Sequence, residues 1–276
     1  MNRMCEVLGV SRSGYYAWKK RPQSARAQEN VYLIDQIKRV YMKNRRVYGS
    51  PRIHLSLVEE GVACGKNRIA RLMRENDIQA EQHRRIKRKA VYTSTARVAN
   101  LVERRFNVTE ANKIWAADIT CFWTGSGWLN LAIVMDLYSR RIIGWAMKSR
   151  MSEELTIAAL EMALLNRRPK SGLIVHTDQG SQYQSQAYQE RLRERKLLPS
   201  MSRRGDCYDN AVVESFFKTL KTELLLEDRF KSREQGSAVI FEYIEIFYNK
   251  KRLHSTLGYV SPEQFEMKNV TQSGVH

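Results

Sequence analysis

The spacing of apolar residues is helical over the first third of the chain. Apolar positions three or four residues apart predict helices over 29–43, 51–60 and 66–76, and residues 1–20 are expected to form a short helical pair. A glycine turn separates the last two long helices, and the final one carries Lys and Arg beside its apolar face. A helix, a glycine turn and a basic helix are the ingredients of a DNA-binding helix-turn-helix unit, although many helical hairpins bind nothing.

From about Asn112 onward the pattern becomes that of a sheet. Apolar and β-branched runs predict three consecutive strands over 113–122, 128–135 and 141–147. Helices are expected over 152–166, 185–196, 209–226 and 232–250, with short strands over 173–176 and 198–201. Three strands followed by alternating helices and strands predict an α/β fold, a mixed sheet flanked by helices, preceded by an all-α helix-turn-helix region.

Composition divides the chain in the same way. The net charge is +18, and residues 1–100 hold 22 Lys and Arg against 8 Asp and Glu, whereas residues 101–276 hold 25 against 21. This asymmetry predicts a nucleic-acid-binding front end joined to a nearly balanced globular body, with a merely basic soluble protein as the alternative. The predicted DNA-binding residues of this front end are Lys66, Arg68, Arg71 and Arg74 on the basic helix, and Arg84, Arg85, Lys87, Arg88 and Lys89 in a basic run. A solvated tether is the alternative for that run.

Cysteine and histidine usage excludes two other classes of protein. The four cysteines show no paired Cys-x-x-Cys spacing and there are five histidines, which argues against a zinc finger and against a disulfide scaffold. The longest apolar stretches are far shorter than a membrane span. The sequence therefore predicts a cytoplasmic protein with no membrane association.

Three carboxylates carry the candidate chemistry. Asp118 lies inside a predicted strand, Asp178 directly follows a strand end, and Glu214 lies on a predicted helix with Lys218 and Lys221 on the same ridge. Mg²⁺ prefers carboxylate oxygens, and two such ions about 4 Å apart activate an attacking oxygen and stabilise a leaving one. Taken singly, each aspartate also fits a salt bridge or a turn cap, and the Glu-Lys spacing also fits ordinary helix stabilisation.

Other polar residues have a structural and a functional interpretation. Asp136 precedes a turn and is expected to cap it, and His176 is expected to orient its surroundings by a hydrogen bond rather than to touch metal or DNA. Arg252 and His254 are assigned to DNA phosphates, with packing of the C-terminal segment as the alternative for His254. The tryptophans at 115, 128 and 145 are expected to lie in the core.

Three motifs give the chain a specific resemblance. They are Trp115-x-x-Asp118-Ile-Thr, His176-Thr-Asp178-x-Gly-Ser-Gln-Tyr183 and Tyr208-Asp-Asn-Ala211-x-x-Glu214-Ser-Phe-Phe-Lys218. Together they resemble the retroviral-integrase-like core of bacterial insertion-sequence transposases, and more narrowly the OrfB product of the copy-out–paste-in family. Segments 8–18, 68–73, 128–145 and 248–262 resemble that family too, so the match covers nearly the whole chain.

The resemblance implies a fold, a chemistry and partners. It implies a ribonuclease-H-like core in which Asp118, Asp178 and Glu214 are a catalytic triad that binds two Mg²⁺ (or Mn²⁺) ions, and Lys221 matches the family's usual basic position. It implies cleavage at the 3′ end of the element by water, then attack of the freed 3′-OH on a phosphodiester. The implied partners are double-stranded DNA at the terminal inverted repeats and the target, further copies of the chain, and the upstream OrfA product, in the bacterial nucleoid.

The expected organisation combines both lines of reasoning. The predicted parts are a helix-turn-helix region (1–80), a basic linker (81–106), the catalytic core (107–226) and a C-terminal helix and tail packing on the core (227–276). A catalytically silent DNA-binding regulator of transposition and a simple nuclease of the same fold are the alternatives. The intact triad argues against the regulator, and the basic front end argues against the nuclease.

Overall fold

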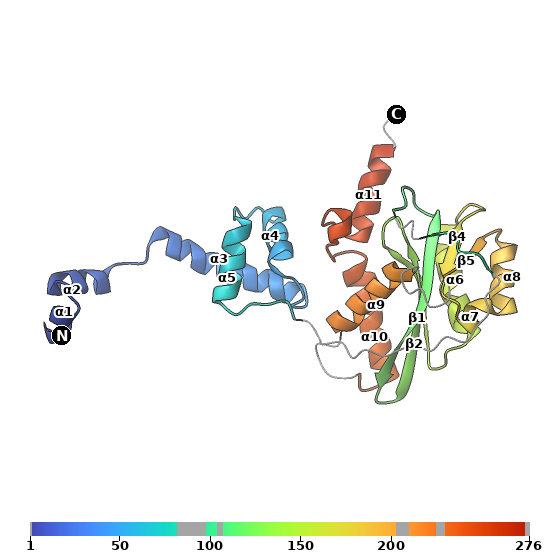
Figure 1. Cartoon of the computed structure of the whole chain (residues 1–276), viewed down its shortest axis with the longest axis horizontal. Helices are drawn as coiled ribbons and strands as arrows, with labels where there is room; N and C mark the ends of the chain where they lie inside the picture. The colour runs from blue at the N-terminus through green and yellow to red at the C-terminus, as the bar shows by residue number, and fades with distance from the viewer. Residues whose placement is uncertain (1, 82–97, 104–106, 203–209, 225–229, 274–276) are drawn as a thin grey trace. The chain divides into compact units, whose positions relative to one another are not determined.

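The computed structural model describes residues 2–81, 98–103, 107–202, 210–224 and 230–273 (Figure 1). The chain divides into two compact units, Met1–Ala80 and Glu81–His276. Most of the predicted basic linker, including the run from Arg84 to Lys89, lies outside the described residues. None of the helices in the described ranges is long and apolar enough to cross a membrane.

The first unit is helical, as predicted. Its helices are α1 (Asn2–Val7), α2 (Arg12–Lys20), α3 (Ala25–Lys43), α4 (Ser50–Glu59) and α5 (Lys66–Glu75). Serine hydroxyls start two of them, because Ser11 accepts a hydrogen bond from the Gly14 N–H and Ser24 accepts one from the Ala27 N–H. The second of these caps begins α3 at Ala25, four residues before the predicted start.

The core of the first unit lies between α3, α4 and α5. The buried apolar residues of these helices are Leu33, Ile37, Val40, Ile53, Leu57, Ile69, Leu72 and Met73. They recur at the three- and four-residue spacing of amphipathic helices, so each helix contributes one apolar stripe. This packing leaves the polar face of α5 outside the core, as a helix-turn-helix unit requires.

The second unit is built on a five-stranded mixed sheet. Its strands are β1 (Ile114–Thr124), β2 (Gly127–Asp136), β3 (Ile142–Lys148), β4 (Ile174–Thr177) and β5 (Leu198–Met201). The spatial order is β3-β2-β1-β4-β5, with antiparallel pairing of β1 to β2 and of β2 to β3, and parallel pairing of β1 to β4 and of β4 to β5. All five strands were predicted, and the sheet confirms the predicted mixed topology.

Helices cover both faces of this sheet (Figure 1). The helical elements are α6 (Glu153–Arg167), α7 (Ser181–Gln184), α8 (Gln186–Glu194), α9 (Ala211–Leu224), α10 (Arg233–Glu242), the π-helix η2 (Tyr243–Tyr248), the 3₁₀ turn η3 (Ser255–Leu257) and α11 (Pro262–Ser273). Helix α6 packs against β2 and β3, whereas α9 lies against β1 and α10 against β1 and β2. The helix predicted over 232–250 begins as the α-helix α10 and continues as the π-helix η2. Helices α7 and α11 were not predicted.

The C-terminal segment is fastened to the sheet by side chains. Asn249 accepts a hydrogen bond from the Ile142 N–H (3.0 Å) and donates one to the Ile142 carbonyl (2.9 Å), so it pairs with β3 as a neighbouring strand would. Arg141 binds Glu263 at 3.1 Å and Glu266 at 2.8 Å, which ties α11 to the start of β3. Residues 230–273 thus form part of the same packed unit as the sheet.

Candidate active site

Sheet register brings the first two predicted carboxylates together. In the parallel pair β1–β4, Ala116 lies opposite His176, so Asp118 and Asp178 occupy equivalent positions two residues further along neighbouring strands. Strand β4 ends at Thr177, whereas β1 continues to Thr124. Asp178 therefore lies where the sheet stops pairing, which is where a mixed or parallel sheet presents ligand groups.

The charges of the carboxylates act on one another. Burial raises the pKa of Asp118 well above its usual value, and the negative charges of Asp178 and Glu214 raise it further. The Ile119 N–H and the Lys221 ammonium oppose this by stabilising the charged form. Burial also raises the pKa of Asp178. The three carboxylates predicted from the motifs are thus close enough to interact, with Lys221 as a counter-charge.

Backbone amides orient both aspartates. The Ile119 N–H donates to Asp118 Oδ1 at 2.7 Å, and the Gly180 N–H donates to Asp178 Oδ1 at 2.9 Å. A Cβ on Gly180 would lie 2.9 Å from that same oxygen, so only glycine allows this approach. The glycine in the Asp-Gln-Gly sequence is therefore required by the position of the Asp178 carboxylate.

Helix α9 carries the third carboxylate. Its buried face is formed by Val213, Phe216, Phe217, Leu220 and Leu224, as the helical spacing predicted. Glu214 and Lys218 are exposed beside that face. The Lys221 ammonium lies 5.4 Å from the centre of the Phe122 ring, on the same strand as Asp118. Packing of α9 on β1 thus places the helix's charged ridge next to the strand that bears the first aspartate.

The donor chemistry of this site fits a hard divalent cation. Burial and the negative charges of Asp178 and Glu214 raise the pKa of Asp118, so a cation beside this carboxylate would stabilise its charged form, and Mg²⁺ prefers carboxylate oxygens. In the described parts of the chain, no three His, Cys, Asp or Glu side chains are close enough to hold one ion together. The carboxylates of Asp118, Asp178 and Glu214 are thus of the type that binds such a metal. In the described residues, however, they are not close enough together to form a complete ligand set for one ion.

Similarity to known proteins decides the family. The integrase core domain family matches residues 108–207 and, through a second family of the same description, residues 214–270; an HTH-like domain family matches residues 28–86. The 31 kDa protein of insertion element IS600 from Shigella sonnei is 44% identical over 96% of this chain and 98% of its own. Transposase InsF of insertion sequence IS3A from Escherichia coli (strain K12) is 42% identical over 97% and 94%. The chain belongs to the IS3 family of transposases.

Family membership confirms the resemblance drawn from the motifs. The transposase has an integrase-type, ribonuclease-H-like core preceded by a helix-turn-helix-like domain. Asp118 and Asp178 lie in the first matched integrase segment, and Glu214 is the first residue of the second. The solved catalytic core domain of HTLV-2 integrase in complex with magnesium is 20% identical, with a TM-score of 0.43 over 56% of this chain and 95% of that one.

Two further polar residues have structural roles in the transposase, as predicted. The buried His176 ring is held between the Ser200 hydroxyl at Nδ1 (2.9 Å) and the Ser202 hydroxyl at Nε2 (3.2 Å). Asp136 accepts hydrogen bonds from the Tyr138 and Asn112 N–H groups, both at 3.0 Å, and so caps the turn after β2. These contacts give both side chains a structural role in the fold.

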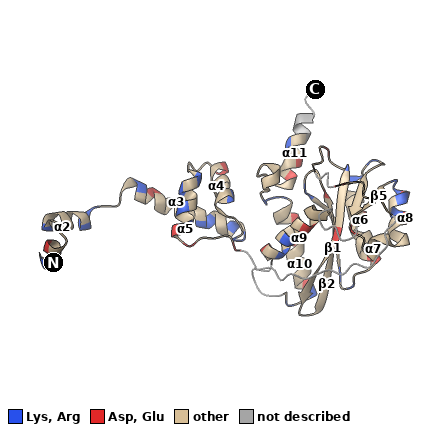
Figure 2. Ribbon diagram, in the orientation of Figure 1, with Lys and Arg blue, Asp and Glu red and all other residues tan. Residues whose placement is uncertain are grey.

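The basic helix α5 divides into exposed and paired cations, and Lys and Arg are prominent on it in Figure 2. Lys66 and Arg74 are exposed. Arg68 instead binds two side chains of α3, Glu29 and Asn30, both at 2.9 Å, and Arg71 pairs with Glu75 at 3.0 Å on its own helix. The helix thus presents two exposed cations, while Arg68 fastens α5 to α3.

The structure places Arg252 and His254, which were assigned to DNA phosphates, among the buried residues. Arg252 is 7% exposed, and its guanidinium binds both oxygens of the buried Glu223 at 2.6–3.1 Å. The His254 ring is 9% exposed and packs edge-on against Tyr248 at 4.8 Å. Arg252, through its contacts with Glu223, and His254, through its packing on Tyr248, thus attach the C-terminal segment to the core.

Glu223 was missed at the level of sequence. It lies between Leu220 and Leu224 on the buried face of α9, nine residues after Glu214, and it is 7% exposed. An acid within an apolar stripe requires a buried partner, because an uncompensated buried charge is costly. That signal was available in the helical pattern, but the partner could not be identified from it.

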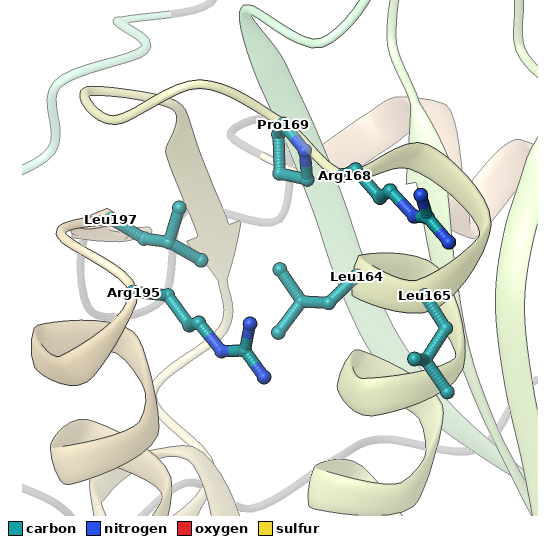
Figure 3. Close-up of a pocket in the computed structure, with 6 residues that line it drawn as sticks. All are labelled: Leu164, Leu165, Arg168, Pro169, Arg195 and Leu197. Atoms are coloured by element: carbon teal, nitrogen blue, oxygen red, sulfur yellow. The ribbon is translucent and has the colours of Figure 1, made fainter.

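A cavity of about 310 Å³ lies apart from the triad (Figure 3). It is lined by Leu164, Leu165, Arg168, Pro169, Arg195 and Leu197, from the end of α6 and the segment between α8 and β5. None of these residues belongs to the predicted site. The candidate catalytic carboxylates thus lie outside this cavity, and Asp178 directly follows the end of β4.

Proposed function

We propose that this transposase cleaves the 3′ ends of its own insertion sequence and transfers them to target DNA through Asp118, Asp178 and Glu214. The observation that carries the proposal is the mutual effect of these charges: Asp178 and Glu214 both raise the pKa of Asp118. Asp178 and Glu214 lie 60 and 96 positions after Asp118 in the sequence, and all three residues are of the type that hard cations bind. The reaction class is polynucleotidyl transfer without a covalent enzyme intermediate.

Each residue has a defined part in this proposal. Asp118 and Asp178 hold the metal with carboxylates fixed by the Ile119 and Gly180 amides, and Glu214 supplies a third carboxylate from α9. Two bound Mg²⁺ or Mn²⁺ ions would supply activation of the attacking oxygen and stabilisation of the leaving one. Lys221 and Lys218 place positive charge on the same ridge of α9, where the phosphodiester backbone has to pass.

DNA recognition is assigned to the first unit. A helix-turn-helix unit places its second helix in the major groove, which in this chain is α5 with Lys66 and Arg74 exposed. The basic run Arg84–Lys89 would add phosphate contacts independent of DNA sequence. The proposed partners are the terminal inverted repeats, target DNA, further copies of the chain and the upstream OrfA product, in the bacterial cytoplasm.

The test uses DNA that carries the native ends of the element, with Mg²⁺. Asp118→Asn, Asp178→Asn and Glu214→Gln are each expected to abolish end cleavage and joining while leaving DNA affinity unchanged. Glu190→Gln is the matched control, since Glu190 is an exposed helical acid outside the site. Each protein is assayed alone and fused to the upstream frame. Binding without cleavage by wild type in both forms would support the catalytically silent regulator instead, and normal cleavage by Glu214→Gln would exclude the triad.

A further inference from the structure

Tyr183 lies directly beside the carboxylate pair and has no part in the proposed reaction so far. It belongs to α7, which begins three residues after Asp178. Its ring is 2% exposed and packs edge-on against Tyr188, with ring centres 5.2 Å apart. The two tyrosines belong to the same core cluster as Trp115 and Ala117 of β1, the residues that precede Asp118.

The hydroxyl groups of both tyrosines are buried without a hydrogen-bond partner among the described residues. A buried hydroxyl without a partner destabilises a fold, and such groups are rare in native proteins. A phenylalanine would fill the same volume and avoid that cost. Retention of a hydroxyl at these positions therefore calls for an explanation outside the stability of the fold.

Only one of the two hydroxyls belongs to a ring near the carboxylates. A Cβ built on Gly180 would lie 2.9 Å from Asp178 Oδ1 and 3.6 Å from Tyr183 Cδ2, so the carboxylate and the ring flank the same glycine. The charges of Asp118 and Asp178, after burial, raise the pKa of the Tyr183 phenol. Burial alone raises that of Tyr188. Tyr183, whose ring flanks Gly180 together with the Asp178 carboxylate, is therefore the tyrosine of this pair beside the site.

The two aspartates have hydrogen-bonding capacity left. Each uses Oδ1 to accept a backbone N–H, from Ile119 for Asp118 and from Gly180 for Asp178. No hydrogen bond to either Oδ2 is made by the part of the chain that the structure describes. A carboxylate that binds metal is usually held by a further donor, which fixes its orientation and favours its charged form.

We propose that the Tyr183 hydroxyl is a positioning donor, which hydrogen-bonds the Asp118 carboxylate when the site is loaded with metal and DNA. Asp118 is the carboxylate of β1, the strand whose Trp115 and Ala117 pack in the same core cluster as Tyr183; consistent with this, the charge of Asp118 raises the pKa of the phenol. Tyr183 touches neither DNA nor the reacting atoms in this proposal; it acts by keeping the carboxylate aligned. The inference rests on the proposed metal-binding role of the aspartates.

The experiment compares Tyr183→Phe with Tyr188→Phe in the full chain, because each change removes one buried, unpartnered hydroxyl. Thermal unfolding without metal is expected at or above the wild-type temperature for both variants. Tyr183→Phe alone is expected to require about tenfold more Mg²⁺, both for half-maximal end cleavage and for the Mg²⁺-induced rise in unfolding temperature. The maximal cleavage rate should change less. In an Asp118→Asn background, Tyr183→Phe should have no further effect on the response of the unfolding temperature to Mg²⁺.

Three results would overturn the proposal. They are an unchanged Mg²⁺ requirement in Tyr183→Phe, the same change in Tyr188→Phe, and a lower unfolding temperature for Tyr183→Phe than for Tyr188→Phe, which would mean a structural role. Failure of the proposed function itself looks different. In that case wild type shows no response to Mg²⁺ in cleavage or in unfolding temperature, whereas failure of the Tyr183 proposal alone leaves the wild-type response intact.

Discussion

The buried pair between Arg252 and Glu223 gives the sharpest prediction about stability. Both side chains are nearly inaccessible, at 8% and 7%. Arg252 makes contacts of 2.6, 2.9 and 3.1 Å with the two carboxylate oxygens, and the Tyr243 hydroxyl donates to Oε2 at 2.7 Å. The pair joins α9, which bears Glu214, to the segment after η2. Its loss should therefore loosen the attachment of the helix that carries the third carboxylate.

The magnitude follows from the charge that is left behind. Arg252→Met removes every contact of the guanidinium and leaves Glu223 buried with one neutral donor. Removal of one partner from a buried ion pair typically costs about 3–5 kcal/mol. The double variant Arg252→Met with Glu223→Leu leaves no buried charge from this pair, and its cost should be about 1–3 kcal/mol for the lost hydrogen bond between Tyr243 and Glu223. The double variant is thus expected to be more stable than the single one.

Denaturant unfolding of the full chain, followed by tryptophan fluorescence, measures this difference. Four of the five tryptophans lie in the second unit, at 115, 123, 128 and 145. The matched control is Arg195→Met, because Arg195 is an exposed arginine of the same unit, and it should change stability by less than about 0.5 kcal/mol.

An opposite outcome would refute this reasoning. If Arg252→Met kept wild-type stability but weakened DNA binding and its salt dependence, the side chain would act on phosphates after all. A double variant less stable than Arg252→Met would show that the buried charge is not the origin of the cost.

Three further predictions concern single residues. Burial raises the pKa of Asp136 from 3.8 to about 6 in the folded protein. The stability contributed by the protonated side chain is therefore fully present below the pKa of the unfolded state and is lost as the pH rises through 6. In denaturant unfolding, wild type should lose about 3 kcal/mol relative to Asp136→Asn between pH 3.5 and 7.5. Arg74→Ala should weaken DNA binding and lower its salt slope by about one in titrations at several salt concentrations, whereas Arg68→Ala should lower the unfolding temperature of the first unit. Gly144→Ala should destabilise by about 3 kcal/mol or more, because its Cβ would lie 2.2 Å from the Ala159 carbonyl oxygen. Gly65→Ala meets open space and should cost less in the same unfolding assay, about 0.5–1 kcal/mol, because Gly65 is the N-cap of α5.

Local patterns predicted the elements of the fold well where each element buries a regular face. Strands β1 to β3 were predicted because long apolar runs alternate with turn residues, and α9 because one helical stripe is apolar throughout. The four-residue α7 has too few positions to show a period. The π-helix η2 depends on packing against its surroundings, since the helical pattern runs through it unbroken.

The candidate site was predicted from spacing and motif, but its assembly was not. That Asp178 follows a strand was evident locally; that this strand pairs in parallel with β1, two residues before Asp118, is a long-range contact that no local pattern encodes. Trp128 shows the same limit. It was expected in the core, yet it is 41% exposed and packs edge-on against Trp123 at the end of the β1–β2 hairpin.

Partners distant in sequence also decide which cations are available to DNA. Arg68 and Arg252 lie in basic segments of the sequence, as Lys66, Arg74 and Lys218 do. From the sequence alone, all five residues were therefore assigned to DNA phosphates. In the folded chain, Arg68 binds Glu29, which is 39 residues away in the sequence, and Arg252 binds Glu223, which is 29 residues away. Lys66, Arg74 and Lys218 are exposed and form no ion pair with any residue that the structure describes. Because only an uncompensated cation releases counterions when it meets a phosphate, the salt dependence of binding should follow these exposed residues rather than the net charge of the chain.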